Sequence, residues 1–343
     1  MGAPSAPAVG IAVDPRDVVG SARAAEAAGL DFVATGDSGT ETFTAAAAVA
    51  VTTERIGIVS SIATWARTPV TTAHAAATVA HLSGGRYTLG LGPMPRPWAR
   101  DWHGMAFDPV LARMREYLLA TRDALDATPE RPTATVGRYH RTTGFPGPAL
   151  PRHEVPMLLA ATGPRMTELG AEVADGLVFN GIHPHAWLSG AATERIATGL
   201  GRAGRERGAL RVGTLRYVGI DDDPRRARDL VRPGLAFYFA VPYFRTLLEP
   251  FGFAAELAAG EAAVAAGDAA AQVAAVSDRM VDAIALTGTA DEVAAGIAGY
   301  AGVVDWVELV TAFGLPRDRA AANTRRALEL GRAGLVGSVS RPR

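Results

Sequence analysis

Short, almost continuously apolar segments recur along the chain and alternate with longer segments whose apolar positions follow a helical period. Such apolar segments are typical of strands in a parallel sheet that is covered by helices. The predicted strands are Ala8–Val13, Phe32–Gly36, Ile56–Ile62, Tyr87–Gly92, Pro156–Ala161, Gly176–Asn180, Leu210–Ile220 and Asp305–Thr311. The predicted helices are Asp17–Ala28, Thr42–Thr53, Thr71–Leu82, Pro109–Ala127, Arg165–Val173, Ala186–Ala203 and Ala290–Tyr300.

One strand–helix–strand unit carries the clearest local signals. The apolar run Ile56–Ile62 leads through a turn with Pro69 into an alanine-rich segment, and Gly84-Gly85-Arg86 separates that segment from Tyr87–Gly92. Proline is tolerated in the first turn of a helix and glycine just past its end. We therefore predict a β-α-β unit here, and similar units can be followed along the rest of the chain.

Eight predicted strands alternate with helices, which is the number in a closed (β/α)8 barrel, the TIM-barrel architecture of the α/β class. An open, doubly wound sheet is the alternative. Two connections, about 93–155 and 221–285, are longer than a loop and one helix, and insertions after strands fall at the C-terminal mouth of a barrel. Because nothing between the units resembles an interdomain linker, residues 1–343 are predicted to form a single domain with these two insertions.

Composition narrows the possible chemistry. The chain has no cysteine, and all 34 of its lysine or arginine residues are arginine, so disulfides, thiolate nucleophiles and lysine Schiff bases are excluded. A formal net charge of -1 without a basic cluster argues against a nucleic-acid partner. The N-terminus lacks signal-peptide features and no run of about 18 apolar residues occurs. We therefore expect a cytoplasmic protein that acts on a small molecule and has no membrane partner.

A set of motifs extends over nearly the whole chain. They are Ala25-Glu26-Ala27-Ala28-Gly29-Leu30-Asp31, Arg67-Thr68-Pro69, the run from Ala77 through Ser83-Gly84-Gly85-Arg86-Tyr87 to Gly92, Arg113-Met114-Arg115-Glu116-Tyr117, the run from Gly163 to Gly170, Ala174-Asp175-Gly176 and the run from Thr287 to Val293. As a set, and in this order, they resemble the luciferase-like monooxygenase family, in which the last of these segments opens the last barrel helix. The resemblance implies a (β/α)8 barrel, commonly a homodimer, that holds either FMN or the deazaflavin coenzyme F420 at its C-terminal mouth.

Two segments are most similar to the deazaflavin branch of this family, namely Pro164–Glu168 and Phe237–Phe239. The resemblance therefore implies an F420-dependent oxidoreductase that transfers a hydride between the reduced deazaflavin and a small organic substrate. An FMN-dependent monooxygenase is the alternative within the family. A non-catalytic barrel that binds the cofactor without turnover is a third hypothesis.

The turn Thr162-Gly163-Pro164-Arg165 joins a predicted strand to a helix start, where backbone N–H groups and the helix dipole attract anions. Gly163 permits close backbone approach, and Arg165 can add a bidentate contact to a phosphate. An ordinary turn with a surface arginine is the alternative. The resemblance favours a site for the cofactor phosphate, and it gives the candidate cofactor-binding residues Ala161, Thr162, Gly163, Pro164, Arg165 and Met166.

Further cofactor-binding candidates stand at the ends of other predicted strands. They are Asp37, Ser60, Ser61, Ile62, Gly92 and Asn180. In the family, the end of the third strand often has a strained and sometimes cis non-proline peptide that supports the deazaflavin ring, and the two serines would offer hydrogen bonds to the ring edge. A polar strand end without this role is the alternative. Asp37 is either a turn cap or a ligand of the cofactor.

The chain departs from the family pattern at two positions. Ser38 follows Asp37 where the family commonly has a proton-transferring histidine, and Pro95 stands where sugar-oxidising relatives have a catalytic glutamate. The second departure argues against a sugar dehydrogenase, because no carboxylate remains there to move a proton. The catalytic residue is therefore unassigned, with Asp37 and His183 as candidates.

The substrate pocket is predicted to include Trp98, Trp102, His183 and Phe239. His183 could bind an anion or exchange a proton near neutral pH, or it could lie in a solvent-facing loop. The tryptophans form either a pocket wall or packing between loop and barrel, and Phe239 belongs either to an apolar lid or to the core of the second insertion. No metal site is predicted, because His183 and His185 have no third ligand nearby.

Overall fold

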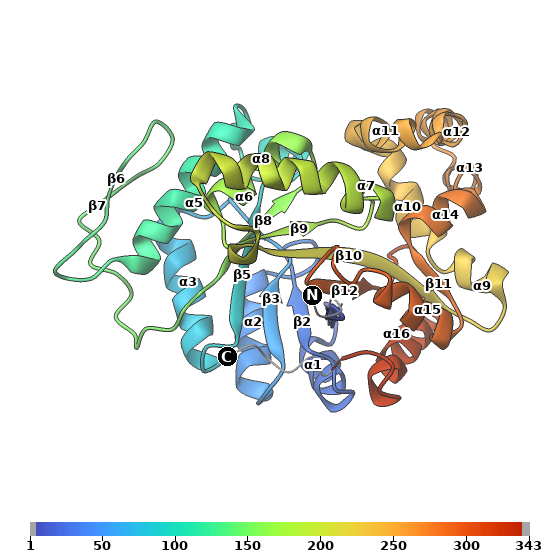
Figure 1. The fold of residues 1–343 in the computed structure, drawn as a ribbon, viewed down its shortest axis with the longest axis horizontal. Helices are drawn as coiled ribbons and strands as arrows, with labels where there is room; N and C mark the ends of the chain where they lie inside the picture. Colours follow the sequence, from blue (N-terminus) through green and yellow to red (C-terminus); the bar gives the residue numbers. More distant parts are fainter. Residues whose placement is uncertain (1–4, 338–343) are drawn as a thin grey trace.

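Eight parallel strands of this computed structural model, which describes residues 5–337, close into a ring. The order is β12-β1-β2-β3-β5-β8-β9-β10, and β10 pairs back onto β12 (Figure 1). These strands are β1 (Ala8–Ala12), β2 (Phe32–Thr35), β3 (Gly57–Ser60), β5 (Tyr87–Gly92), β8 (Met157–Ala161), β9 (Gly176–Phe179), β10 (Arg211–Ile220) and β12 (Trp306–Val310). Every predicted strand is present with small shifts at its ends, so the (β/α)8 barrel is confirmed and the open sheet is not formed.

A helix follows each barrel strand along the chain. These helices are α1 (Val18–Ala27), α2 (Thr42–Thr52), α3 (Pro69–Leu82), α5 (Val110–Asp126), α6 (Pro164–Val173), α8 (Thr193–Ala203), α15 (Ala290–Ala298) and α16 (Arg317–Arg332). The predicted helix Ala186–Ala203 consists of α7 (His185–Trp187), a π-helical turn η1 (Leu188–Ala192) and α8. Thr68 caps α3 through the Thr71 N–H, and Pro69 occupies the first turn as expected.

The last barrel helix is α16, which the sequence analysis did not predict. The segment expected to open the last helix instead begins α15, which precedes β12. Arginine, aspartate and glutamate dominate the exposed positions of α16, so its apolar stripe is narrow. Its buried Asn323 donates to the Val218 carbonyl at 2.8 Å and accepts from the Ile220 N–H at 3.0 Å, which ties α16 to β10.

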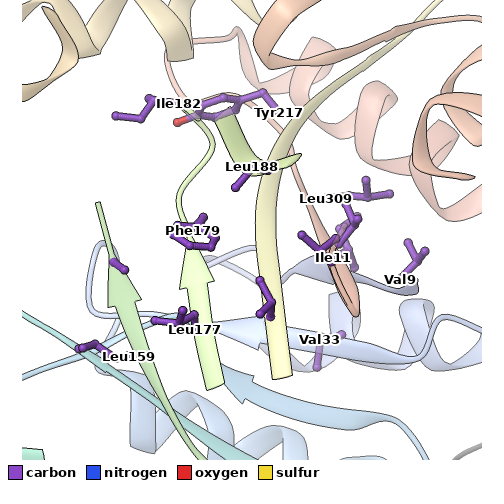
Figure 2. Packing of buried hydrophobic residues seen from close by; sticks show 14 of the residues in the cluster. Val9, Ile11, Val33, Leu159, Leu177, Phe179, Ile182, Leu188, Tyr217 and Leu309 are labelled. Atoms are coloured by element: carbon purple, nitrogen blue, oxygen red, sulfur yellow. The ribbon is translucent and has the colours of Figure 1, made fainter. Parts of the chain in front are cut away.

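The side chains of the strands form two separate layers of core. Val307 and Leu309 of β12 point outward into the large cluster between strands and helices, where Val9, Ile11 and Val33 also lie (Figure 2). The alternate residue Trp306 points into the barrel and packs with inward residues of other strands. These inward partners are Phe32, Val59, Leu158 and Val178.

Trp306 fills the lower part of the barrel interior. Its ring meets Phe32 edge-to-face with centroids 5.3 Å apart, and a Cβ added at Gly213 would come within 1.8 Å of it. A glycine is therefore needed on β10 where the indole crosses that strand. The interior beneath the C-terminal mouth is consequently packed and apolar.

The first connection predicted as an insertion contains a short helix and a hairpin besides α5. Helix α4 (Arg96–Asp101) follows β5 at the mouth. The hairpin of β6 (Ala134–Val136) and β7 (Arg141–Thr143) lies along α5, because Glu116 of α5 accepts hydrogen bonds from the N–H groups of Arg138, Tyr139 and His140.

The second connection leaves β10 and forms a group of short helices on the right of Figure 1. They are α9 (Pro224–Asp229), α10 (Arg232–Ala236), η3 (Phe237–Ala240), α11 (Pro242–Leu248), η4 (Glu249–Phe251), α12 (Ala254–Ala266), α13 (Ala269–Ala274) and α14 (Asp278–Ile284). The chain then returns as β11 (Leu286–Gly288), which pairs with the end of β10. None of the helices between residues 5 and 337 has the length and apolar character needed to cross a bilayer.

Candidate functional site

The predicted cofactor residues all lie at the C-terminal ends of barrel strands. Asp37 follows β2, the segment from Ser60 to Ile62 ends β3, Gly92 ends β5, Ala161 ends β8 and Asn180 follows β9. In a barrel of parallel strands these ends meet at one mouth, where active sites of this fold are built. The sequence candidates are thereby brought to one side of the molecule.

The start of α6 is open to an anion. Gly163 is the N-cap residue, no side chain caps this helix, and Pro164 occupies its first turn. The first N–H groups of a helix have no intrahelical partner, so the amides of Gly163 and Arg165 are available to a bound phosphate. Arg165 is exposed and lines a surface hollow together with Arg115 and Arg202, which form ion pairs with Glu172 and Glu168.

Tyr243 of α11 also reaches this helix start, a position that sequence reasoning did not assign to it. A Cβ added at Gly163 would lie 3.4 Å from the Tyr243 hydroxyl oxygen, so the phenol stands directly over the turn. Burial raises the pKa of Tyr243 to about 12, and the hydroxyl therefore remains a neutral donor. The aromatic-rich stretch of the insertion was the only signal in the sequence.

Asp37 is fully engaged within the protein. Its carboxylate accepts bonds from Arg67 at 2.8 and 2.9 Å, from the Thr64 N–H at 2.7 Å, from the Thr64 hydroxyl at 3.0 Å and from the Thr42 N–H at 3.1 Å. Arg67 also binds Glu41 and lies over the Phe43 ring. Arg67 was part of a recognised motif, but its pairing with Asp37 was not predicted.

These contacts fix the ionisation of Asp37. Burial alone would raise its pKa, but the hydrogen bonds from Arg67, Thr64 and Thr42 outweigh this effect and lower the pKa below its ordinary value. A carboxylate held in this way stays charged at neutral pH and is poorly suited to proton transfer. The surroundings of Asp37 favour a role in holding the β2 and β3 ends together.

The two serines at the end of β3 have different environments. The Ser60 hydroxyl is buried in a chain with Thr42 at 3.0 Å and Tyr87 at 2.6 Å, so it does not face the mouth. The Ser61 hydroxyl oxygen is buried without a hydrogen-bond partner. The Ser61–Ile62 peptide bond is cis, as the family resemblance suggested for this position.

Ile62 and Gly92 are in contact across the mouth. A Cβ added at Gly92 would lie 2.6 Å from Ile62 Cδ1 and 2.9 Å from Ala160 Cβ. The glycine at the end of β5 therefore leaves space that Ile62 occupies. Together with Ser61, Ile62 forms the surface that a planar ring at the mouth would contact.

His183 is buried between two backbone carbonyl oxygens, and because a neutral imidazole has one N–H, it can donate to only one of them. Its Nδ1 lies 3.1 Å from the Asn180 carbonyl oxygen and its Nε2 lies 3.0 Å from the Thr162 carbonyl oxygen. Burial lowers the pKa of His183 to about 4, although the two carbonyls act to raise it. With no exposed surface, this histidine links the ends of β8 and β9 and does not offer a free nitrogen to a substrate.

The aromatic candidates divide between the mouth and the core of the insertion. Trp98 and Trp102 of the α4 region stack with centroids 4.4 Å apart, and Trp102 is 65% exposed. Phe239 is buried inside the insertion, where a Cβ added at Gly260 would lie 2.3 Å from its ring. This position corresponds to the core alternative considered for Phe239, not to a pocket wall.

Other aromatic side chains meet where β10 and β12 end. Phe237 packs edge-to-face on Phe313 at 5.0 Å, and Tyr217 lies 6.2 Å from Phe313. The Tyr217 hydroxyl lies 3.5 Å from that of Tyr238. Phe237 and Phe313 are each about half exposed, so they and the tyrosines form an apolar wall at the mouth, to which the predictions did not assign Phe313 or Tyr217.

Glu308 is a further residue that the sequence analysis did not identify. It is a lone carboxylate in the apolar run Trp306-Val307-Glu308-Leu309-Val310, which is the signal that could have identified it. Its side chain is buried and its Oε2 has no hydrogen-bond partner. Among residues 5–337, no three histidine, aspartate or glutamate side chains gather in a way that could hold a metal ion.

Comparisons with known proteins agree on the family. Residues 2–305 match the model of the family described as luciferase-like monooxygenase. A protein of Mycobacterium tuberculosis with the provisional name coenzyme F420-dependent oxidoreductase is 34% identical over 232 residues, which cover 63% of this chain and 65% of that protein. The chain thus spans just under two thirds of that relative's length.

Two methanopterin reductases are also similar. The 5,10-methylenetetrahydromethanopterin reductase of Archaeoglobus fulgidus is 31% identical over 232 residues, covering 66% of this chain and 67% of the relative. The structure of the coenzyme F420 dependent tetrahydromethanopterin reductase from Methanopyrus kandleri superposes with a TM-score of 0.76 at 23% identity, over 95% of this chain and 98% of that one. The structural likeness concerns the fold.

Proposed function

Because the chain belongs to the luciferase-like monooxygenase family, we propose that it is an oxidoreductase that uses coenzyme F420 to exchange a hydride with a small organic substrate. Two of the relatives described above carry F420 in their names, and the F420-named Mycobacterium protein is 34% identical in the matched region. The observation that carries the proposal is the open start of α6 at the barrel mouth, beside Arg165 and Tyr243.

The residues at the mouth fit the cofactor. Its phosphate would be held by the amides of Gly163 and Arg165, with the Tyr243 hydroxyl as a further donor. Its ring would lie against Ser61 and Ile62, where a buried hydroxyl has no partner in the protein. The phosphate site follows β8 and the ring site ends β3, and only β5 lies between these two strands.

When bound, the deazaflavin supplies or accepts a hydride at a ring carbon in a two-electron step. The chain's own part is to orient the reactants and exclude water. Trp98 and Trp102 on one side, and Phe237 and Phe313 on another, provide apolar surface for a substrate. Asp37 and Arg67 fix the shape of the mouth, and neither is proposed to exchange a proton.

An FMN-dependent monooxygenase remains the alternative within the family, because the family's name alone does not choose the cofactor. The two hypotheses differ in their oxygen dependence. A deazaflavin carries carbon where a flavin needs nitrogen to react with oxygen, so F420-dependent turnover is expected to be equal under air and argon.

We also propose that the protein is cytoplasmic and forms a homodimer. Sedimentation of the purified protein would test the homodimer.

The decisive experiment measures binding and turnover with each cofactor. The purified chain is titrated with F420 and with FMN, and consumption of each reduced cofactor is followed under air and under argon with a panel of small organic substrates. Tight F420 binding with oxygen-independent consumption supports the proposal. Tight FMN binding without F420 binding contradicts it, and F420 binding without consumption on any substrate indicates a non-catalytic barrel.

A further inference from the structure

Glu308 points into the barrel toward the cofactor site. Side chains alternate along a strand, and its neighbours Val307 and Leu309 belong to the outer core. Trp306, two residues earlier and on the same face, belongs to the inward cluster. Glu308 therefore stands one layer above Trp306, between the apolar lower interior and the mouth.

The strands on both sides of Glu308 offer it no charged partner. In register with it are Gly10 of β1 and Leu215 of β10. Burial raises the pKa of Glu308 to about 8, and the Ser61 hydroxyl opposes this only in part. The side chain is therefore a neutral carboxylic acid at neutral pH, with a proton to donate.

Ser61 and Glu308 are both incomplete as hydrogen-bonding groups. Ser61 Oγ and Glu308 Oε2 are buried, and neither has a partner of acceptable geometry. On β1, Gly10 is in register with both Glu308 and the inward-pointing Phe32 of β2, and the Ser61 hydroxyl is still close enough to Glu308 to act on its carboxyl through a side-chain hydrogen bond. Buried polar atoms without partners are rare in native proteins and call for a ligand or a further contact.

We propose that Glu308 and Ser61 form a two-member hydrogen-bond relay beneath the bound cofactor ring. The Glu308 acid donates its proton to Ser61 Oγ, and the Ser61 hydroxyl, whose acceptor site is then filled, donates its own hydrogen to an acceptor on the ring edge. Glu308 is thus a positioning residue that acts through Ser61. This inference rests on the proposed function, because it takes the ligand to be the cofactor ring.

The direction of the relay depends on the protonation of Glu308. Once ionised, the carboxylate can only accept, so the Ser61 hydrogen turns toward it and away from the ring. Three other ionisable groups near the mouth keep one state through the same range. Asp37 stays ionised beside Arg67, Tyr217 has a pKa raised well above its ordinary value, and His183 stays neutral.

Cofactor affinity as a function of pH tests the relay. Oxidised F420 is titrated into wild type, Glu308→Gln, Ser61→Ala and the exposed control Glu329→Gln between about pH 6 and about pH 9.5. In wild type and the control, the dissociation constant is expected to rise by up to about tenfold per pH unit above about pH 8. Glu308→Gln keeps a donor toward Ser61, so it is expected to bind as tightly as wild type at neutral pH but without this slope.

The serine variant tests the second member of the relay. Ser61→Ala is expected to bind more weakly at neutral pH, by a few-fold to about tenfold, and to lack the slope. Infrared spectra should contain a protonated-carboxyl band that disappears in Glu308→Gln and titrates with pH in Ser61→Ala. Any titration of the cofactor itself is common to all four proteins and cancels in the comparison.

The relay is overturned if wild type shows no slope, if Glu308→Gln keeps the slope, or if the infrared band is absent. Failure of the proposed function has a different signature. If F420 does not bind at any pH, the proposed function falls, and the same pH series with FMN decides the relay. If neither cofactor binds, both proposals fall.

Discussion

Arg67 is the residue on which the charge balance at the barrel mouth depends. Replacing it by methionine leaves the Asp37 carboxylate buried with only the threonine donors. Loss of one partner from a buried ion pair typically costs about 3 kcal/mol or more, so we expect the free energy of unfolding of Arg67→Met to fall by about 3 kcal/mol. Urea denaturation monitored by circular dichroism measures this loss.

The matched control is Arg100→Met, which breaks an exposed ion pair with Asp101. Such pairs contribute less than about 1 kcal/mol, so this variant should unfold close to wild type. Equal losses in the two variants would contradict the role given to Arg67. The contribution of Asp37 also has a pH signature: because its folded-state pKa lies below the ordinary value, its stabilisation is present at neutral pH and is lost as the pH falls through that lowered pKa.

Glu308 should destabilise the fold as the pH rises. Between its ordinary pKa of 4.5 and the raised value of about 8, the unfolded chain has lost the proton that the folded chain still holds. Each pH unit in this window therefore costs about 1.4 kcal/mol of unfolding free energy, and the cost is complete above the raised pKa. Urea midpoints of wild type should fall across this window relative to Glu308→Gln, and parallel curves would refute the burial of an uncompensated acid.

Residue roles were less predictable than residue positions. The resemblance identified Ser60, Ser61 and Asp37 together. The roles of the two serines differ because successive side chains at the end of β3 point to opposite faces: Ser60 bonds to the buried hydroxyls of Thr42 and Tyr87, and Ser61 faces the barrel interior. The two carbonyl contacts of His183 come from segments 3 and 21 residues away, and such pairings are not encoded in local pattern. Glu308 was overlooked because it looks like a strand residue until its inward direction is known.

At the start of α6, a single substitution is expected to change the stability of the helix and the affinity for the cofactor in opposite directions. Gly163 is an N-cap in extended backbone, and a Cβ there would make an ordinary contact with Tyr243. In Gly163→Asp the carboxylate would cap the helix and complement its dipole, so we expect stability to rise by about 0.5 kcal/mol. The same charge should repel a phosphate and weaken F420 binding by at least about tenfold.

Thermal unfolding and F420 titration of the same preparation measure these two opposite effects. Gly163→Ser, which caps without charge, is the matched control and should lose much less affinity. If Gly163→Asp binds F420 as well as wild type, the phosphate does not lie at this helix start. A loss of both stability and binding would indicate a disturbed turn, and Gly163→Ser would then decide the question.

Elements with a strong apolar pattern were predicted almost to the residue. The strands are continuous apolar runs because both of their faces are buried, and this pattern is visible without tertiary information. Helix α16 was missed because a polar side chain, Asn323, makes part of its contact with the barrel. The buried face of α16 therefore lacks a continuous apolar pattern in the sequence. The three-residue strands β6 and β7 form a local hairpin and β11 pairs with the distant β10, and none of these three strands left a comparable signal.

At the scale of the whole molecule, the barrel depends on its last strand. β12 lies between β1 and β10 and pairs with both, so a chain ending after Asp305 would leave two open strand edges and an exposed interior. We expect this truncated chain to aggregate or to lack a cooperative thermal transition, although it retains all of the residues that match the family. Cooperative unfolding of the truncated chain in calorimetry, at a midpoint near that of the full chain, would contradict this expectation.

The pairing of β10 with β11 has a consequence for how this protein can be altered. Val218, Gly219 and Ile220 lie beside Leu286, Thr287 and Gly288, and the Asp221 N–H donates to the Gly288 carbonyl at 3.0 Å. The second insertion therefore begins and ends at this pairing of β10 with β11, and Phe237 and Tyr243 lie on the segment between the two strands. We expect that a different segment joined at this same pairing would change which molecules the enzyme accepts and leave the register of the eight barrel strands unchanged.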